Sequence, residues 1–269
     1  MPPRSDRPRL AQRGVTLVEM IVVIAVIAVV GAMVAVFLRT PIESYAAQDR
    51  RARLADAADT ALRRMTREVR LALPNSVRVS SVGGVHYLEF LATRSGGRYR
   101  AEGGGDILDF VAPDTGFDVL GPAVSVQAGD RIAVYNLGIA GADAWAGDTL
   151  ADYTGASGSV NAIAIAAKQF PLASPGQRFQ VVEGAVSYAC DPAAGTLTRY
   201  WGYAPAAAQP TAFAAGTAQA LLATGVTACR ITYQPGVTER SGLLALTLEL
   251  GRDGENVRLY ASAQVGNQP

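Results

Sequence analysis

One carboxylate, Glu19, lies near the start of an otherwise apolar segment, RGVTLVEMIVVIAVIAVVGAMVAVF, which covers residues 13–37. An ionised carboxylate beside the hydrocarbon of a membrane costs several kcal/mol unless a cation pairs with it. A carboxylate at this position therefore predicts a positively charged partner, supplied when the segment enters a membrane or a packed helical bundle.

Residues typical of catalytic sites give a weaker signal. His86 is the only histidine, it lies in the strand-like sequence VHYLEF, and the chain has no GxSxG motif, so a catalytic triad is not indicated. The glycine runs at 96–97 and 103–105 lack the strand and helix context of a phosphate-binding loop. We expect no cofactor and no enzymatic activity, because no coupled set of titrating groups is evident.

Metal binding is not indicated by ligand spacing. The aspartates within residues 106–118 and 143–152 do not follow the EF-hand pattern, so a Ca²⁺ site there is only a hypothesis, and our prediction is no metal. Cys190 and Cys229 have no CxxC partner or histidine cluster, which disfavours zinc. In an oxidising compartment the two form one disulfide, and the alternative is two unpaired buried thiols.

The apolar segment is long enough to cross a membrane once. Residues 20–38 carry no charge, and 19 residues at about 1.5 Å each give a helix of roughly 28 Å. Four arginines lie within residues 4–13, so the positive-inside rule keeps the N-terminus cytoplasmic and places the residues after Thr40 outside the cytoplasm. The alternatives are an uncleaved signal anchor or a signal peptide cut after Ala46, although the apolar core exceeds the usual length of about 7–15 residues.

Arg13-Gly14 followed by Val15-Thr16-Leu17-Val18-Glu19 resembles the type IV prepilin signature. The resemblance implies cleavage between Gly14 and Val15 by a prepilin peptidase, N-methylation of Val15, and a fifth-position glutamate at Glu19. Val15 stands where Phe is usual, and Met20 where Leu is frequent. Both replacements conserve size and polarity.

The prepilin signature also supplies the cation that Glu19 requires. Cleavage creates an amine at Val15, one helical turn before Glu19, and a neighbouring subunit's amine can neutralise the buried carboxylate. The implied partners are other pilins, the prepilin peptidase, the membrane and an inner-membrane assembly platform. The net charge of +1 argues against a nucleic-acid partner. The implied location is the inner membrane, with the remainder periplasmic, and then a pilus at the cell surface.

The remaining sequence predicts an α+β, pilin-like fold. We expect a cleaved leader at 1–14, a membrane-spanning helix at 15–40, an amphipathic continuation at 41–74 that ends near Leu73, and a β-rich domain at 75–269. The arginine-rich face of the continuation is typical of a solvated surface with i to i+4 ion pairs. Among the expected strands are residues 106–112, a hairpin turn is expected at 251–255, and 140–162 is expected to be a long loop.

Patches of the later sequence narrow the resemblance. Residues 56–79, LEFLATRSGGRYRAE, GFDVLGP, VYNLG, VSYAC and TACRITYQ are similar to the O-type minor pilins of the mannose-sensitive haemagglutinin pilus. This implies a low-abundance subunit of a type IV pilus. The alternatives are a J-type minor pseudopilin of type II secretion, or a signal-anchored periplasmic enzyme or binding domain.

Overall fold

The computed structural model describes residues 14–236 and 241–269, without the side chains of residues 38–43. The expected leader therefore lies outside the described residues, apart from Gly14. The chain divides into two compact units after Arg50, although the helix α1 (Leu17–Arg70) runs through this division. Each unit is described by itself below.

Helix α1 has no glycine or proline between residues 42 and 70, and it ends earlier than expected, at Arg70. The backbone N–H groups of Leu71 and Ala72 turn back to the carbonyls of Glu68 and Val69, and the N–H of Leu73 then donates to the carbonyl of Leu91. These bonds satisfy carbonyls at the helix end and bring the chain onto the sheet before Pro74.

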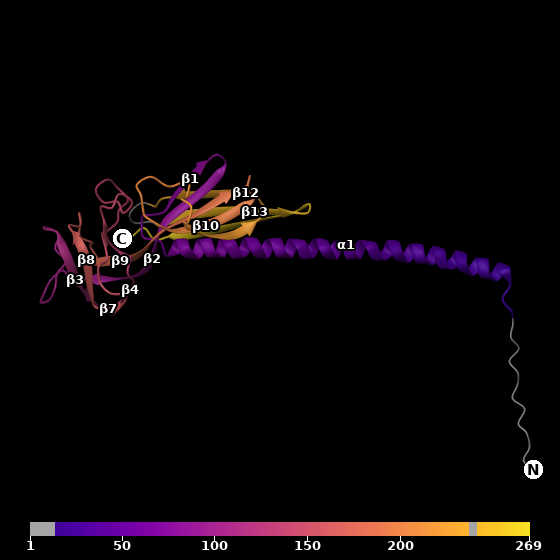
Figure 1. Ribbon diagram of the computed structural model, residues 1–269, viewed down its shortest axis with the longest axis horizontal. Coiled ribbons are helices and arrows are strands. Elements are labelled where there is room, and N and C mark those ends of the chain that lie inside the picture. The colour runs from indigo at the N-terminus through magenta and orange to yellow at the C-terminus, as the bar shows by residue number, and fades with distance from the viewer. Residues whose placement is uncertain (1–13, 237–240) are drawn as a thin grey trace, which may run out of the picture. The chain divides into compact units, whose positions relative to one another are not determined.

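Beyond the helix, the described residues form antiparallel strands, as Figure 1 shows. The strands are β1 (Arg78–Val82), β2 (Val85–Tyr99), β3 (Asp114–Leu120), β4 (Val124–Val126), β5 (Arg131–Val134), β6 (Leu150–Asp152), β7 (Gly158–Val160), β8 (Ala162–Lys168), β9 (Arg178–Asp191), β10 (Thr196–Tyr203), β11 (Ala218–Thr224), β12 (Val226–Gln234), β13 (Gly242–Arg252) and β14 (Glu255–Val265). The α+β fold class is therefore confirmed.

The strands belong, within the described residues, to three sheets. The largest has the order β11-β10-β9-β2-β3-β8, with β1 beside β2 and with β5 between β6 and β9. The second has the order β12-β13-β14, and β4 pairs with β7. The long strands β2 and β9 pair over most of their length and form the spine of the domain.

One hydrophobic core lies between α1 and the sheets. Its helix residues recur at the spacing of one helical face, and the alternate leucines of β13 point toward them. The residues are Ala58, Ala61, Leu62, Met65 and Val69 from α1, with Leu244, Leu246, Leu248 and Leu250 from β13. Each fully buried leucine contributes about 1.5–3 kcal/mol through the hydrophobic effect. This core fixes residues 54–69 of α1 to the β domain.

A second core, which the sequence did not reveal, lies at the other end of the β2–β9 pair. It is formed around Tyr99, Phe117, Phe170 and Phe179 and receives side chains from β3, β4, β5 and β8. The pairing of β2 with β9 shifts register on both sides of Thr93, where Ala92 faces Gly184 with a φ of 145°. The bulges turn the ribbon so that each half faces a different core.

Two predicted segments differ from the structure. Residues 106–112 contain no strand, because the Asp109 carboxylate accepts the N–H of Val111 at 2.6 Å and the N–H of Asp109 donates to Asp114 at 2.7 Å. These turn bonds compete with a strand ladder. Residues 140–162 are not a loop throughout, since β6 and β7 lie within them and pair with β5 and β4.

Candidate functional site

The segment that precedes α1 is open and non-helical. Gly14, Val15 and Thr16 lie outside the helix, and Val15 is 71% exposed. A Cβ added at Gly14 would have no atom within 4 Å, and Gly14 is not among the glycines with positive φ. Nothing in the fold of the described residues therefore requires glycine at position 14, so a requirement for it would come from a partner that contacts this bond.

Thr16 caps the first turn of α1. Its Oγ1 accepts the N–H of Glu19 at 3.2 Å, and its carbonyl accepts the N–H of Met20 at 3.1 Å. Glu19 is thus at the third helical position, where a capping box would return its carboxylate to the N-cap backbone. Only the Thr16 half of this box is formed: within the part of the chain that the structure describes, the Glu19 carboxylate has no partner.

Two energies of different size, one favourable and one unfavourable, apply to a carboxylate at the position of Glu19. The helix dipole favours an anion in the first turn by about 0.3–1 kcal/mol. Placing an ionised carboxylate in a membrane costs about 2.5–3.5 kcal/mol at the centre of a span, by insertion measurements. Glu19 lies in the first turn of α1, away from that centre, and the dipole would offset only part of such a cost if the segment entered a membrane.

The first half of α1 exposes its apolar side chains. Leu17–Phe37 has 21 residues with a mean hydropathy of 3.1, and none of this surface is buried within the structure. At about 1.5 Å per residue it is about 31 Å long, which matches the hydrocarbon thickness of a bilayer. The segment is therefore long and apolar enough to cross a membrane, and it is equally suited to pack against other apolar helices.

Comparison with protein families identifies the segment that contains these residues. Residues 9–35 match the prokaryotic N-terminal methylation motif. The matched range includes Gly14, Val15 and Glu19 and most of the apolar span. It indicates a type IV pilin-like or pseudopilin protein and suggests a structural subunit rather than an enzyme. Comparison with curated proteins and with solved structures gives no significant match.

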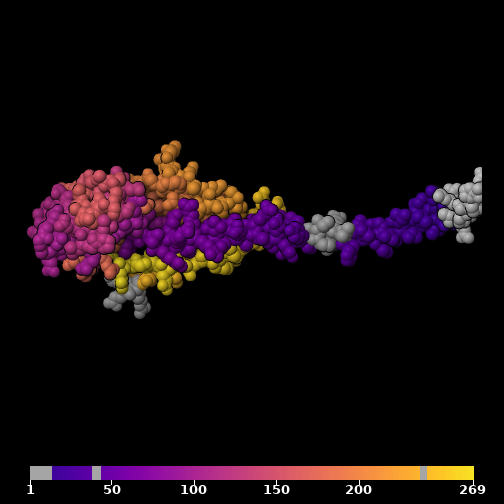
Figure 2. All heavy atoms as spheres, turned by 90° about the horizontal axis from the view of Figure 1, so that it is seen from below, coloured from indigo at the N-terminus to yellow at the C-terminus, as the bar shows by residue number. Residues whose placement is uncertain are grey.

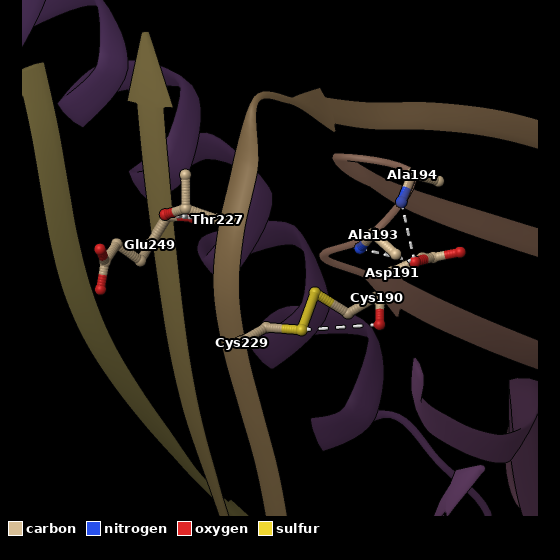
Figure 3. Close-up of a disulfide and its surroundings, with 7 residues drawn as sticks. All are labelled: Cys190, Asp191, Ala193, Ala194, Thr227, Cys229 and Glu249. Carbon is tan, nitrogen blue, oxygen red and sulfur yellow. Dashed lines mark hydrogen bonds between the residues drawn. A yellow bond between two sulfur atoms is a disulfide. The ribbon is translucent and has the colours of Figure 1, made fainter. Parts of the chain in front are cut away.

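Cys190 and Cys229 are joined in a disulfide (Figure 3). Cys190 lies near the end of β9 and Cys229 lies in β12, with their Cα atoms 6.5 Å apart. Since β9 and β12 belong to different sheets, the disulfide is a covalent link between two ladders. Leu62 and Met65 of α1 line the same small space beside it.

The residues considered for catalysis or metal binding lie in strand pairs, turns and ion pairs of the β domain. His86 is half-buried in β2, opposite Cys190 of β9. The aspartates of the two acidic stretches mostly accept backbone N–H groups of turns or pair with arginine: Asp109, Asp114, Asp143, Asp118 with Arg100, and Asp152 with Arg131. Within the described ranges no group of three potential ligands could hold a metal.

Two carboxylates that join separate elements through side-chain hydrogen bonds were missed by sequence reasoning. Glu89 in β2 is fully buried, accepts from Arg78 at 2.6 Å and from the Tyr203 hydroxyl at 2.8 Å, and has a pKa that burial raises against the opposing effect of these two donors. The Arg78 guanidinium also lies 3.8 Å over the ring of Trp145. Alternation along VHYLEF places Glu89 on the same side of β2 as Tyr87, and this is the only local signal.

The second carboxylate, Glu68, is partly buried and joins α1 to the large sheet. It accepts from Arg64 at 3.0 Å on its own helix, from Arg199 of β10 at 2.9 Å and from the Tyr188 hydroxyl of β9 at 2.7 Å. Burial favours the protonated acid, but these donors outweigh burial and lower the pKa of Glu68. The expected i to i+4 pairs are present here and between Asp59 and Arg63.

Proposed function

We propose that this chain is a minor pilin of a type IV pilus of the mannose-sensitive haemagglutinin type. A prepilin peptidase cuts it between Gly14 and Val15, Val15 is N-methylated, and the mature subunit joins the filament through its N-terminal helix. The observation that carries the proposal is the Glu19 carboxylate, which lies without a partner in the described residues, four residues after Val15 and inside the matched methylation motif.

The residues at the cut support each chemical step. Hydrolysis of the Gly14–Val15 amide leaves a carboxylate on Gly14 and an ammonium on Val15. The bond is accessible because it precedes the helix, and the methylated amine keeps its positive charge. The ammonium of one subunit then approaches the Glu19 carboxylate of its neighbour, where each ion offsets the desolvation cost of the other.

The apolar span supports a location in the inner membrane before assembly. Arginines within residues 4–13 keep the leader cytoplasmic, so the β domain is periplasmic and its disulfide forms in an oxidising compartment. On assembly, contacts with the helices of other pilins replace lipid around Leu17–Phe37. Partners are the peptidase, the assembly platform and neighbouring pilins.

A minor pseudopilin of type II secretion is the second candidate, because the same motif and the same pairing chemistry serve both filaments. The sequence patches similar to the O-type minor pilins favour the pilus. The two candidates differ in the filament that contains the chain, so antibody detection in sheared pili or in secretion pseudopili distinguishes them.

The decisive experiment is the mass of the mature N-terminal peptide. The full-length chain is expressed in membranes with and without a prepilin peptidase, purified and digested. The proposal requires a peptide that starts at N-methylated Val15 only when the peptidase is present. An intact leader in both samples, or a start at Ala47, would contradict the proposal and support a signal anchor or a cleaved signal peptide.

A further inference from the structure

The C-terminal end of α1 carries a basic patch that faces away from its own domain. The patch consists of Arg63, Arg67, Arg70 and the adjacent Leu71, which line a shallow open depression together with Thr66. The opposite side of these turns is buried in the core. Figure 2 shows α1 from a side on which no strand covers the helix.

The arginines of the basic patch are largely unneutralised. Arg63 pairs only with Asp59, at 2.6 Å and in an exposed position. Within the described residues, Arg67 and Arg70 have no hydrogen-bond or ion-pair partner, and Leu71 is 61% exposed. The helix dipole favours cations here by about 0.3–1 kcal/mol, but the spacing of i to i+3 and i to i+4 between them costs roughly 0.2–0.5 kcal/mol per like-charged pair. An external anion would remove this repulsion, and the dipole does not explain the exposed leucine.

A complementary surface, the acidic tip, lies between β2 and β3. It consists of Glu102, Asp106 and Asp109 with the exposed side chains of Ile107 and Val111. Arg100, which adjoins the tip, pairs with Asp118 at 3.1 Å. In the described part of the chain, the carboxylates of Glu102 and Asp106 have no partner. Val111 is 88% exposed. The tip thus combines anions with an apolar side chain, as the patch combines cations with Leu71.

The two surfaces are too far apart in one molecule to meet. The basic patch joins the sheet where the N–H of Thr93 donates to the carbonyl of Leu71. The acidic tip begins beyond Tyr99, six residues further along β2, which corresponds to roughly 20 Å of strand. Their complementarity is therefore available only to a second molecule.

We propose that the acidic tip of one copy of this chain docks on the basic patch of a second copy. Glu102 and Asp106 pair with Arg67 and Arg70, and Val111 covers Leu71. Because the two surfaces differ, the contact is heterologous and leaves a free tip and a free patch at the ends, so it can repeat as an open helical assembly. The contact uses surfaces of the β domain and of the end of α1, so it does not depend on the proposed processing of the N-terminal motif.

Charge reversal tests the contact in the full-length chain, purified in detergent before any processing. A photo-crosslinking phenylalanine derivative replaces Val111, and the crosslinked dimer is quantified and mapped by peptide mass. We expect crosslinks to residues 63–71 of α1. We expect about a tenfold loss of dimer in Arg67→Glu/Arg70→Glu and in Glu102→Arg/Asp106→Arg, and a decrease with salt in the parent chain. Arg230→Glu, an exposed arginine on β12, is the matched control and should leave the dimer unchanged.

Mixing the two reversed variants gives the sharper result. Each variant alone has like charges on tip and patch, whereas the mixture brings a basic tip to an acidic patch and should restore a crosslink between the two different chains. No restoration, or crosslinks that map elsewhere, would overturn the proposal. Because the assay uses unprocessed protein, a failure of Gly14–Val15 cleavage would leave its outcome unchanged.

Discussion

The Tyr188 hydroxyl of β9 donates a 2.7 Å hydrogen bond to the carboxylate of Glu68 on α1. Arg199 of β10 donates to the same carboxylate oxygen, so two strands are bonded to one residue of the helix. The negative charge of the acceptor strengthens both bonds. Because the carboxylate is partly buried, it in turn needs these donors to remain ionised. The attachment of the helix to the large sheet is therefore sensitive to the ionisation of Glu68.

This arrangement predicts a loss of stability in acid. The pKa of Glu68 is lower in the folded protein than its ordinary value of 4.5, so its contribution is fully present above pH 4.5 and is lost as the pH falls through the folded pKa. Denaturant unfolding from pH 7 to pH 3 should show this loss, and Glu68→Gln should remove it from the profile.

Glu89→Gln is the matched variant, with the opposite sign. Burial raises the pKa of Glu89, so the contribution of this group is present below pH 4.5 and is lost as the pH rises through the folded pKa. The stability difference between the parent and Glu89→Gln should fall with rising pH, whereas the difference for Glu68→Gln should rise. Two differences with the same slope would contradict these assignments.

Gly14→Phe should block maturation without affecting the fold. A side chain at position 14 meets no atom of the described chain, so its effect acts on approach of the peptidase to the Gly14–Val15 bond. Immunoblotting should show full-length precursor in the membrane. Gly31→Ala is the control, since Gly31 lies in the apolar half of α1, beyond the cleavage site, and a Cβ there also has no atom within 4 Å. Normal processing of Gly14→Phe would refute the proposed cleavage site.

Glu19→Val should be cleaved but should not assemble. Under the proposed function the variant removes the anion that pairs with the neighbour's Val15 ammonium, and an unpaired buried ammonium costs about 3–5 kcal/mol. The fraction of mature subunit in sheared filaments, relative to membranes, measures the effect. Glu19→Gln keeps the side-chain length and should fail equally, because charge is the required property. Incorporation of either variant at the parental level would exclude the amine-pairing mechanism.

Loss of the disulfide should destabilise the β domain. Cys190 and Cys229 are 39 positions apart, and the chain-entropy estimate for a closed loop of this size is about 4 kcal/mol. Cys190→Ala/Cys229→Ala should show a lower denaturation midpoint than the parent in oxidising buffer. In reducing buffer the two proteins should differ much less, and a difference that persists there would show that side-chain packing, not the crosslink, is responsible.

Local sequence signals explain what could be predicted. The hairpin at 251–255 is confirmed, with Asp253 and Gly254 at φ of 50° and 80° between two strands paired without a bulge, because this dipeptide itself favours the turn. The N-terminal motif is equally local, since Gly14, Val15 and Glu19 lie within six consecutive residues.

Long-range pairing explains what could not be predicted. Strands β6 and β7 have three residues each and are stabilised by β5 and β4, so no periodicity marks them. The partners of Glu68 on β9 and β10 are 120 and 131 residues away. Strand β8 is different, since AIAIAAK alternates clearly and the signal was present but missed.

The Cys190–Cys229 link has a mechanical consequence for a subunit under load. Tension that peels β12, β13 and β14 away from the large sheet would meet a covalent bond next to α1, rather than side-chain packing alone. While the disulfide is intact, tension applied in this way can extend only the part of the chain that follows Cys229. The β12-β13-β14 sheet therefore stays linked to the large sheet beside α1.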